Sequence, residues 1–312
     1  MDGIMHNICP MINKSQLKIS VVIPVYNESE VLEQVLDAIL NQTLSSSFYE
    51  VIAVDNNSTD NSFEILKNYE ERYSNFFSFK QYISGSGPTR NTGVNYTQSE
   101  LILFLDGDMI ADSTLLEEHI LAHEDHYGSV LGYFTTDWKE TDSGFLQFLA
   151  DSEIQNAFPV KDRGIVNYEH FYTGNISVPK ELLTKAGIFD ENYNGYGVED
   201  IDLGYRLYLY GDKIKFCKTA HAIHKYSPLF KPYKKKKYLA GKQLRYLVTK
   251  FPHLSRIFTF ERYAPYSILL LATLFTVLFP IRNFVPLYTK KINSGFYYWT
   301  IRWSMYCGFM NW

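Results

Sequence analysis

The chain has 312 residues, of which 46% are hydrophobic and 16% aromatic, and it carries a formal net charge of −4 at pH 7. This length can bury a sizeable core in one large domain or two smaller ones. Its three cysteines are far apart and odd in number, which excludes a disulfide framework and fits a reducing compartment. The segment from Met1 to Lys18 lacks the apolar core of a secretory signal.

The first third of the chain alternates predicted strands and helices. A β-branched run starting at Lys18 predicts a strand, which Pro24 and the polar loop after it bring to an end. Apolar residues at helical spacing predict a helix over 30–41, with Ser29 as its N-cap. The remaining segments, in chain order, are a strand over 49–54 that ends in Asp55, a helix over 62–73, a loop with Gly and Pro at 85–88, a short helix carrying Arg90, and an apolar strand over 101–105.

Three repeats of strand, loop and helix predict a parallel sheet with right-handed crossovers. In such sheets the ligand binds at the carboxyl ends of the strands, where Tyr26, Asp55, Arg90 and Asp106 would converge. No Gly-x-Gly-x-x-Gly follows the first strand and no Walker lysine is present. A dinucleotide site and a P-loop are therefore disfavoured.

The triplet Asp106-Gly107-Asp108 comes directly after the apolar strand over 101–105, so that a buried strand delivers two carboxylates to its tip. Burying carboxylates is costly unless a cation meets them. Mg²⁺ or Mn²⁺ holding a diphosphate satisfies that need, because such ions take a few carboxylates and complete their shell with phosphate oxygens. The alternative is a surface turn, in which Asp-x-Asp occurs by chance.

The C-terminal quarter is basic and then apolar. Ten Lys and Arg and one acidic residue lie between Lys231 and Arg262, and the uncharged stretch from Ala264 to Ile281 follows. A second stretch, from Gly295 to Trp312, is aromatic and contains only Arg302 as a charge. Two interpretations stay open: contact with an anionic membrane surface from the cytoplasmic side, or a helical pair packed on a soluble domain or a dimer partner.

Several blocks, in order, resemble the family 2 glycosyltransferases of GT-A fold over residues 17–226. The blocks are Val22-Ile23-Pro24-Val25-Tyr26-Asn27-Glu28, Asp55 to Asp60, Arg90-Asn91-Thr92-Gly93, Asp106-Gly107-Asp108, Thr173-Gly174-Asn175, Gly187 to Glu191 and Gly195 to Arg206. The resemblance implies an α/β, Rossmann-like, mostly parallel sheet flanked by helices, and the sequence after it predicts a C-terminal basic and hydrophobic helical tail. Four segments are expected: a nucleotide-sugar-binding half over 17–110, an acceptor-binding half over 111–226, a basic aromatic segment over 227–262 and a hydrophobic membrane-associated tail over 263–312.

The resemblance also implies roles in donor binding. Asp55 would accept the N3–H of uracil, and Pro24, Tyr26 and Glu28 would frame the base and ribose. Arg90 would stabilise the phosphates, Asp106 would touch the ribose or the metal, and Asp108 would bind Mn²⁺ or Mg²⁺. Gly107 belongs to the same donor-binding motif, and Gly174 and Asn175 would line the donor-sugar pocket. Structural alternatives remain: an Asx turn or helix N-cap for Asp55, and a solvated helix face for Arg90.

The remaining predicted roles concern the acceptor and the metal. The resemblance implies that Asp200 acts as general base on the acceptor hydroxyl and that Glu199 binds the acceptor or donor sugar. The alternative is favourable electrostatics of acidic residues at a helix N-terminus. Tyr196 would stack on a sugar or be an ordinary loop residue. His224 fits the late family block better than His221 as a metal ligand, although a packed or surface histidine is the other interpretation.

Together these features predict a metal-dependent, inverting hexosyl- or N-acetylhexosaminyltransferase of glycan or polysaccharide biosynthesis. It would move one sugar from a UDP-sugar to a hydroxyl of a saccharide or lipid-linked acceptor. The alternatives are an inactive protein of this fold that binds sugar or membrane, and a processive polysaccharide synthase. Gln243-Leu244-Arg245-Tyr246 departs from the Gln-x-x-Arg-Trp of processive synthases. No nucleic-acid partner is expected, and the tail could support an oligomer.

Overall fold

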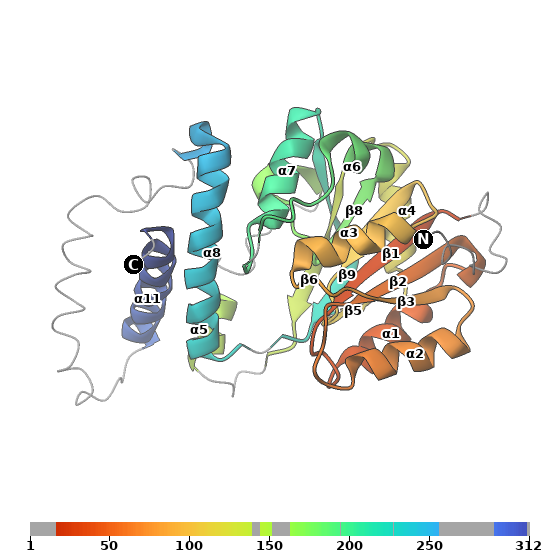
Figure 1. The fold of residues 1–312 in the computed structure, drawn as a ribbon, viewed down its shortest axis with the longest axis horizontal. Coiled ribbons are helices and arrows are strands. Elements are labelled where there is room, and N and C mark those ends of the chain that lie inside the picture. The colour runs from red at the N-terminus through yellow and green to blue at the C-terminus, as the bar shows by residue number, and fades with distance from the viewer. Residues whose placement is uncertain are drawn as a thin grey trace, which may run out of the picture. The chain divides into compact units, whose positions relative to one another are not determined.

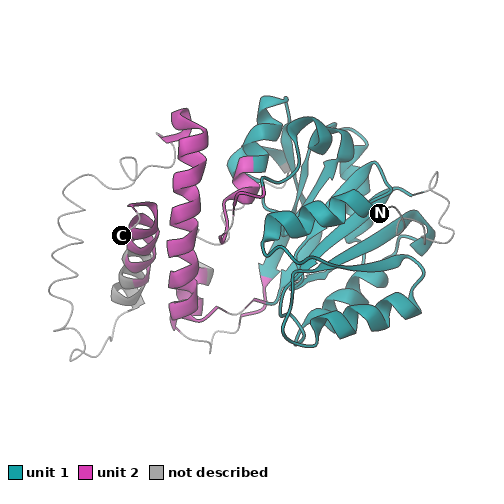
Figure 2. Cartoon of the chain, viewed as in Figure 1, with its two compact units in different colours: residues 1–135, 159–190, 203–225 teal, residues 136–158, 191–202, 226–312 magenta. Residues whose placement is uncertain are grey.

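The computed structural model describes residues 17–138, 144–151, 163–193, 195–226, 228–255 and 290–310. The chain divides into two compact units, coloured in Figure 2. Unit 1 comprises residues 1–135, 159–190 and 203–225, and unit 2 comprises residues 136–158, 191–202 and 226–312. This division differs from the four segments expected from the sequence, which stay a prediction.

Unit 1 begins with a parallel half-sheet. The strands β1 (Ile19–Val25), β2 (Tyr49–Asp55), β3 (Phe76–Lys80) and β4 (Leu101–Leu105) lie in the order β3-β2-β1-β4, and each neighbouring pair is parallel. They are connected through α1 (Leu32–Leu40), η1 (Ser46–Phe48), α2 (Ser62–Arg72) and α3 (Ser86–Tyr96). This confirms the expected parallel sheet and adds β3, which the sequence interpretation missed.

Beyond β4 the pairing becomes antiparallel, so the sheet is mixed rather than mostly parallel. Strands β8 (Asn175–Pro179), β6 (Val130–Thr136), β9 (Ile214–His224) and β5 (Met109–Ala111) continue the sheet in that order, and β7 (Arg163–Val166) pairs with β9. Helices α4 (Leu115–His123), α6 (Lys180–Ala186) and α7 (Glu199–Leu209) and the turn η2 (Tyr168–His170) lie between these strands in sequence. The reversal follows from β8, which runs antiparallel to both β4 and β6.

Alternation along β1 separates the two faces of the sheet. Ile19, Val21, Ile23 and Val25 belong to one core that also takes in buried residues of α1, α2 and α4. Val22 points to the other face, where it meets Gly93 of α3. Figure 1 shows α1 and α2 on one side of these strands and α3 on the other. Period-two alternation therefore places Arg90 of α3 on the face opposite that core.

The start of α1 corrects one expectation. Ser29 does not cap this helix, because the cap position is Val31 and no side-chain hydrogen bond is made there. The carbonyl of Glu28 instead accepts hydrogen bonds from the backbone N–H groups of Val31 and Leu32. The N–H of Ser29 donates to Asp60, which ties this loop to the loop after β2.

Unit 2 is helical in its described residues. It contains α5 (Gly144–Asp151), the 21-residue α8 (Phe230–Lys250), η3 (Pro252–Leu254) and α11 (Lys290–Met310). An aromatic cluster joins the helices, with Phe145 and Phe148 of α5, Phe230 and Tyr233 of α8, and Tyr297 of α11. The basic segment of the sequence is thus largely one amphipathic helix, as expected for a helical tail.

The stretch from Ala264 to Ile281 lies outside the described residues. Within the part of the chain that the structure describes, no helix combines the length and the apolar character needed to cross a bilayer. Contact of the tail with a membrane, and the cytoplasmic location that would go with it, stay predictions.

Candidate functional site

The predicted donor-site residues all lie in unit 1, and an ion pair and a contact between a carboxylate and an imidazole organise them. In the first, Arg90 of α3 donates from Nη2 to Oδ1 of Asp106 at 2.7 Å. The Arg90 side chain is only 6% exposed, and its guanidinium lies 5.7 Å from the centre of the Phe189 ring. Asn91 fixes Phe189 through reciprocal hydrogen bonds of 2.9 Å between its side-chain amide and the Phe189 backbone. A buried guanidinium is thus positioned at the tip of β4.

The second pair joins Asp108 to His224, with Oδ2 and Nε2 3.1 Å apart. Strand register explains it, because β5 and β9 are antiparallel with Met109 opposite His224. The Lys225 N–H also donates to the Asp108 carbonyl at 2.9 Å. His221 is used differently, since its two ring nitrogens contact Asp112 and Thr135. His224, and not His221, is therefore the histidine that lies beside Asp108, and its role as a metal ligand stays a prediction.

A divalent ion fits this second pair. Two ligands about 2.1 Å from an octahedral ion are about 3 Å apart when they occupy neighbouring positions, which matches the separation of these two atoms. The mixed oxygen and nitrogen donors suit Mn²⁺ better than Mg²⁺. Among the residues the structure describes, no group of three or more His, Cys, Asp or Glu is arranged to hold a metal. Further ligands would have to come from a bound molecule or water.

Two loops at the strand ends are bound tightly to each other. Oδ1 of Asn27 accepts from the Thr59 N–H at 2.8 Å, and the Asn27 N–H donates to Ser58 at 3.0 Å. Asp60 accepts from the N–H groups of Ser29 and Ser62, both at 3.0 Å. Burial acts to raise the pKa of Asp60, but these hydrogen bonds outweigh it and lower the pKa to about 2. Asn27, Ser58 and Asp60 are supporting residues that the sequence interpretation did not single out.

Asp55 sits at the end of β2 beneath this crosslink. Its carboxylate is fully buried and accepts from the Ser58 N–H at 3.2 and 3.3 Å, which is the turn geometry considered as the structural alternative. Nearby in sequence, Tyr26 is 55% exposed, whereas Pro24 is half-buried. Glu28 is also half-buried, and its N–H donates to Ser62. An exposed ring beside a buried carboxylate is available to a planar ligand.

Two glycines allow close approach around Asp106. A Cβ on Gly107 would lie 2.9 Å from the Pro24 carbonyl oxygen, so any side chain there would push the acidic turn away from β1. A Cβ on Gly174 would lie 3.2 Å from Oδ2 of Asp106. The Gly174 carbonyl accepts from the Asp106 N–H at 3.2 Å. Both glycines therefore set the position of the acidic turn.

Asn175 belongs to an interior hydrogen-bond network. Its Nδ2 donates to the carbonyls of Tyr133 and Ala220, at 3.1 and 2.9 Å, so its Oδ1 must be the acceptor that His119 contacts at 2.9 Å. The other ring nitrogen of His119 contacts Ser177, which His123 also contacts. Burial lowers the pKa of His119 to about 4, and burial together with the neighbouring histidines lowers the pKa of His123 to about 3. The side-chain amide of Asn175 thus joins β8, β6, β9 and α4.

The predicted acceptor residues Tyr196, Glu199 and Asp200 lie in unit 2, on a segment that one face of α8 supports. A Cβ on Gly195 would overlap the Gln243 side chain, and Gly197, with φ of 77°, lies against Ala240. The Lys236 ammonium lies 5.0 Å from the Tyr196 ring centre. Glu199 is buried, and Asp200 accepts from the Ile201 N–H at 2.8 Å, as an acidic residue at a helix start does.

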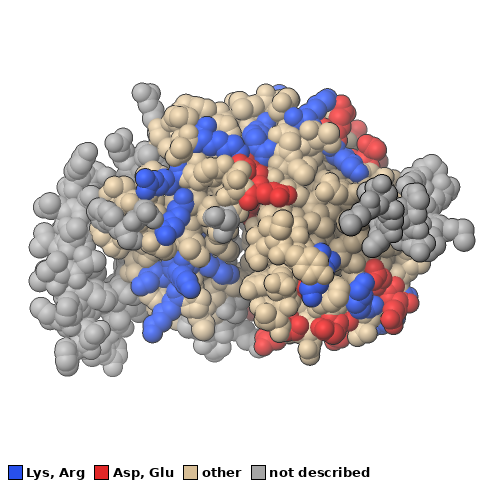
Figure 3. All heavy atoms as spheres, in the orientation of Figure 1, with Lys and Arg blue, Asp and Glu red and all other residues tan. Residues whose placement is uncertain are grey.

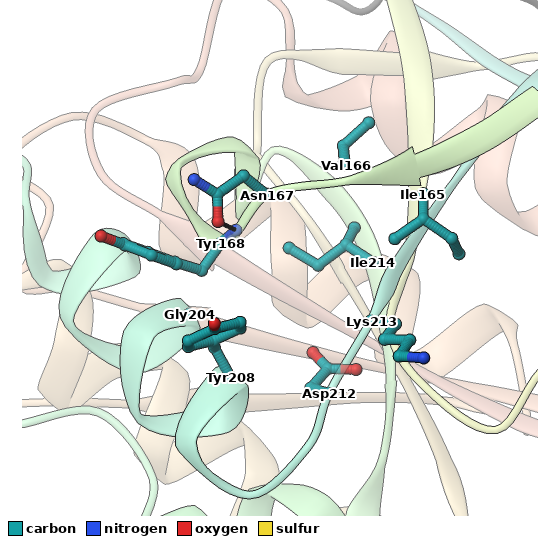
Figure 4. Close-up of a pocket in the computed structure, with 9 residues that line it drawn as sticks. All are labelled: Ile165, Val166, Asn167, Tyr168, Gly204, Tyr208, Asp212, Lys213 and Ile214. Atoms are coloured by element: carbon teal, nitrogen blue, oxygen red, sulfur yellow. Dashed lines mark hydrogen bonds between the residues drawn. The ribbon is translucent and has the colours of Figure 1, made fainter.

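A cavity of about 380 Å³ lies elsewhere in unit 1, between β7, η2, α7 and β9. Figure 4 shows Ile214 in its floor, with Tyr168 and Tyr208 on one side and Ile165 and Val166 on the other. None of the residues predicted for the site lines it. The cavity therefore does not coincide with the predicted donor site.

Two family models match the chain. One, described as glycosyl transferase family 2, matches residues 20–172, and the other, described as the N-terminal domain of galactosyltransferase, matches residues 161–232. A poly(ribitol-phosphate) beta-glucosyltransferase of Bacillus spizizenii is 37% identical over 119 residues, which are 37% of this chain and 19% of that protein. A validoxylamine A glucosyltransferase of Streptomyces hygroscopicus is 27% identical over 218 residues, or 62% of this chain and 52% of that protein. The chain spans about half or less of the length of these curated relatives.

Solved structures with the same fold include two glycosyltransferases. A mannosyltransferase of Pyrobaculum calidifontis in complex with GDP-Man and Mn²⁺ matches with a TM-score of 0.63 and 15% identity, over 94% of this chain and 87% of that one. The S. aureus protein TarS, residues 1–349, in complex with UDP, matches with a TM-score of 0.56 and 17% identity, over 78% and 73%. At these identities the likeness shows the fold alone. It confirms the GT-A fold expected from the sequence.

Proposed function

We propose that the chain is a family 2 glycosyltransferase, which the family model over residues 20–172 and the curated relatives support, and that it transfers one sugar from a nucleotide sugar to a hydroxyl of a saccharide or lipid-linked acceptor. The observation that carries the proposal is the pairing of Arg90 with Asp106 and of Asp108 with His224 at the acidic turn after β4. This arrangement offers one buried cation and one pair of metal-binding atoms, as a diphosphate requires. A UDP-sugar is the donor that we favour; of the two structural neighbours, one is in complex with UDP and the other with GDP-Man.

The residues of unit 1 would bind and orient the donor. Asp108 and His224 would hold Mn²⁺, which when bound neutralises charge that develops on the leaving diphosphate. Arg90 would add a second positive charge to the phosphates. The exposed ring of Tyr26 would cover the base, and Asp55 would reach its N3–H only if the hydrogen bonds from Ser58 were shared or exchanged.

The residues of unit 2 would act on the acceptor. Asp200 would take the proton of the acceptor hydroxyl while that oxygen forms its bond to the anomeric carbon and the bond to the diphosphate breaks. A direct displacement of this kind inverts the anomeric configuration. Glu199 and Tyr196 would hold the sugar rings, Glu199 by hydrogen bonds and Tyr196 by stacking.

Calorimetric titration of the full chain with UDP, GDP and dTDP, with and without Mn²⁺, tests the donor site. We expect UDP to bind most tightly and to need the metal, and we expect His224→Gln to weaken metal-dependent binding about tenfold or more. His221→Gln is the matched control, because it changes a histidine of the same strand that contacts Asp112 instead. If no nucleotide binds, the proposal is wrong.

The acceptor assignment has its own test. Asp200→Asn should leave the affinity for UDP unchanged while sugar transfer, followed with a radiolabelled UDP-sugar, falls by at least about a hundredfold. Turnover that survives this substitution would show that another group acts as base.

A further inference from the structure

The helix α8 is the most strongly charged element among the described residues. It carries eight Lys and Arg between Phe230 and Lys250 and no Asp or Glu. Figure 3 shows Lys and Arg atoms gathered over the part of unit 2 where α8 lies. Among the described residues, Lys231, Lys234, Lys235, Lys236, Lys237 and Lys242 form no ion pair with an acidic side chain. So much positive charge on one helix calls for an anion from outside the chain.

Two of these lysines differ from the rest in their position. Lys236 and Lys237 are half-buried, whereas Lys234 and Lys235 are exposed. The Lys236 ammonium lies 5.0 Å from the ring centre of Tyr196 and 4.3 Å from that of Tyr226. These aromatic contacts hold its charge beside a residue predicted to bind the acceptor.

Lys237 lies in the field of the predicted base. Burial lowers the pKa of its ammonium, and the negative charge of Asp200 acts in the opposite direction. An ammonium that has lost part of its hydration gains from a second anion nearby. The contact of Lys237 with the Tyr233 ring, at 5.0 Å, does not supply that anion.

The same helix face fixes the whole acceptor segment. Gln243 lies against Gly195, Tyr246 packs on Tyr193 with ring centres 4.9 Å apart, and Lys250 donates to the buried Asp202 at 2.7 Å. Positions 236, 243, 246 and 250 repeat at helical spacing, so this is one continuous face of α8. Lys236 lies on this face, which packs against the segment that carries Asp200, and Lys237 is the next residue of the same helix.

We infer that the acceptor carries phosphate groups and that Lys236 and Lys237 bind one of them beside Asp200. This inference rests on the proposed function, because it assigns the substrate class of the acceptor. Phosphate is the anion that we propose, because lysine binds phosphate as a compact point charge, and the test below compares it with a carboxylate. The neighbouring phosphates of a longer acceptor would be attracted by the long-range electrostatic field of Lys231, Lys234 and Lys235, without direct contact.

A fluorescent glycerol-phosphate oligomer is the probe, and its affinity for the full chain is measured by anisotropy at two salt concentrations. The double variant Lys236→Gln, Lys237→Gln should bind it about tenfold or more weakly, as expected when charge-assisted contacts are lost. The matched control Lys234→Gln, Lys235→Gln removes the same charge from exposed positions and should weaken binding less than about threefold. Replacing Lys236 and Lys237 by Arg should restore most of the affinity.

Other arms of the experiment overturn the inference. Equal losses in the two double variants would mean that only the net charge of α8 matters. Tighter binding of a uronate oligomer, or binding only to vesicles containing phosphatidylglycerol, would assign the lysines to carboxylates or to a lipid surface. The affinities for UDP, GDP and dTDP with Mn²⁺ are measured in parallel: if a nucleotide binds and the oligomer does not, the inference fails alone, and if no nucleotide binds, the proposed function fails.

Discussion

Arg90 carries the only positive charge that the structure places directly on the acidic turn within the described residues. We expect Arg90→Gln to lower the free energy of unfolding by about 2 to 3 kcal/mol, because it leaves Asp106 without its charged partner in a partly buried position. Urea titration measures this change. The control is Lys67→Gln, which breaks an exposed pair with Glu70 and should cost less than about 1 kcal/mol. If both variants lose a similar free energy of unfolding, the pair of Arg90 with Asp106 contributes no more to stability than an exposed ion pair.

The histidines of the Asn175 network should make stability fall in acid. The folded protein keeps His119 and His123 neutral, with pKa values of about 4 and 3, whereas the unfolded chain protonates them below about pH 6.5. Protons therefore favour the unfolded state, so this stability is complete above pH 6.5 and is lost as the pH falls toward 4. For His119 alone the loss is about 3 kcal/mol over that range.

Urea titrations between pH 4 and pH 7 check this dependence. The variant His119→Gln should be less stable at pH 7 and should show a flatter decline in acid, because one group that titrates only on unfolding has been removed. His253→Gln changes an exposed histidine and should keep the decline of the parent protein. An unchanged decline in His119→Gln would contradict the assignment.

At the scale of elements, the packing of α3 against β1 determines the position of Arg90. Gly93 faces Val22 so closely that a Cβ would overlap the Val22 side chain. We expect Gly93→Ala to lower the free energy of unfolding by about 1 to 3 kcal/mol, since the helix must move away from the strand. The affinity for UDP should fall with it, because the same helix carries Arg90. The control is Gly144→Ala in α5, where a Cβ meets nothing within 4 Å, and this change should be neutral or slightly stabilising. If the two variants change the free energy of unfolding equally, α3 can move to accept the extra methyl group without cost.

Elements with a clear local pattern could be predicted from the sequence. The strands β1, β2 and β4 and the helices α1 and α2 lie where periodicity placed them, within a residue or two. β3 was missed because its five residues alternate poorly and carry three Phe. α8 lies in the basic tail, which was expected to be helical, and its buried residues Tyr233, Ala240, Leu244 and Leu247 repeat at helical spacing.

The candidate site shows the limit of sequence reasoning more sharply. The order of strands and helices along the chain was enough to predict that Arg90 and Asp106 lie close together at the strand ends. The contact of Asp108 with His224 joins residues more than a hundred positions apart and depends on the register of β5 against β9, which no local pattern contains. The crosslink of Asn27 with Ser58 and Thr59 is of the same kind, because a polar loop residue gives no sign of its distant partner.

At the scale of the whole molecule, the two units should respond differently to loss of the C-terminal helix. α11 covers aromatic side chains of α5 and α8 within unit 2, and its Gly308 approaches the α8 backbone closely. A chain that ends at Arg262 would expose Phe145, Phe230 and Tyr233, so we expect it to bind a hydrophobic dye and to aggregate. Its affinity for UDP should stay within about twofold of the full chain, because the residues predicted to bind UDP lie in unit 1 and the shortened chain lacks only residues of unit 2.

Two point variants test whether loss of packing, rather than the shorter length of the chain, causes the dye binding. Ile301 is 3% exposed and belongs to the aromatic cluster, so Ile301→Asp should reproduce the dye binding of the shortened chain. Met310 is 40% exposed at the end of α11, and Met310→Asp should behave like the full chain. If the shortened chain and Ile301→Asp both stay monomeric and bind no dye, α11 is not needed to cover α8. The apolar face of α8 must then be covered by other residues.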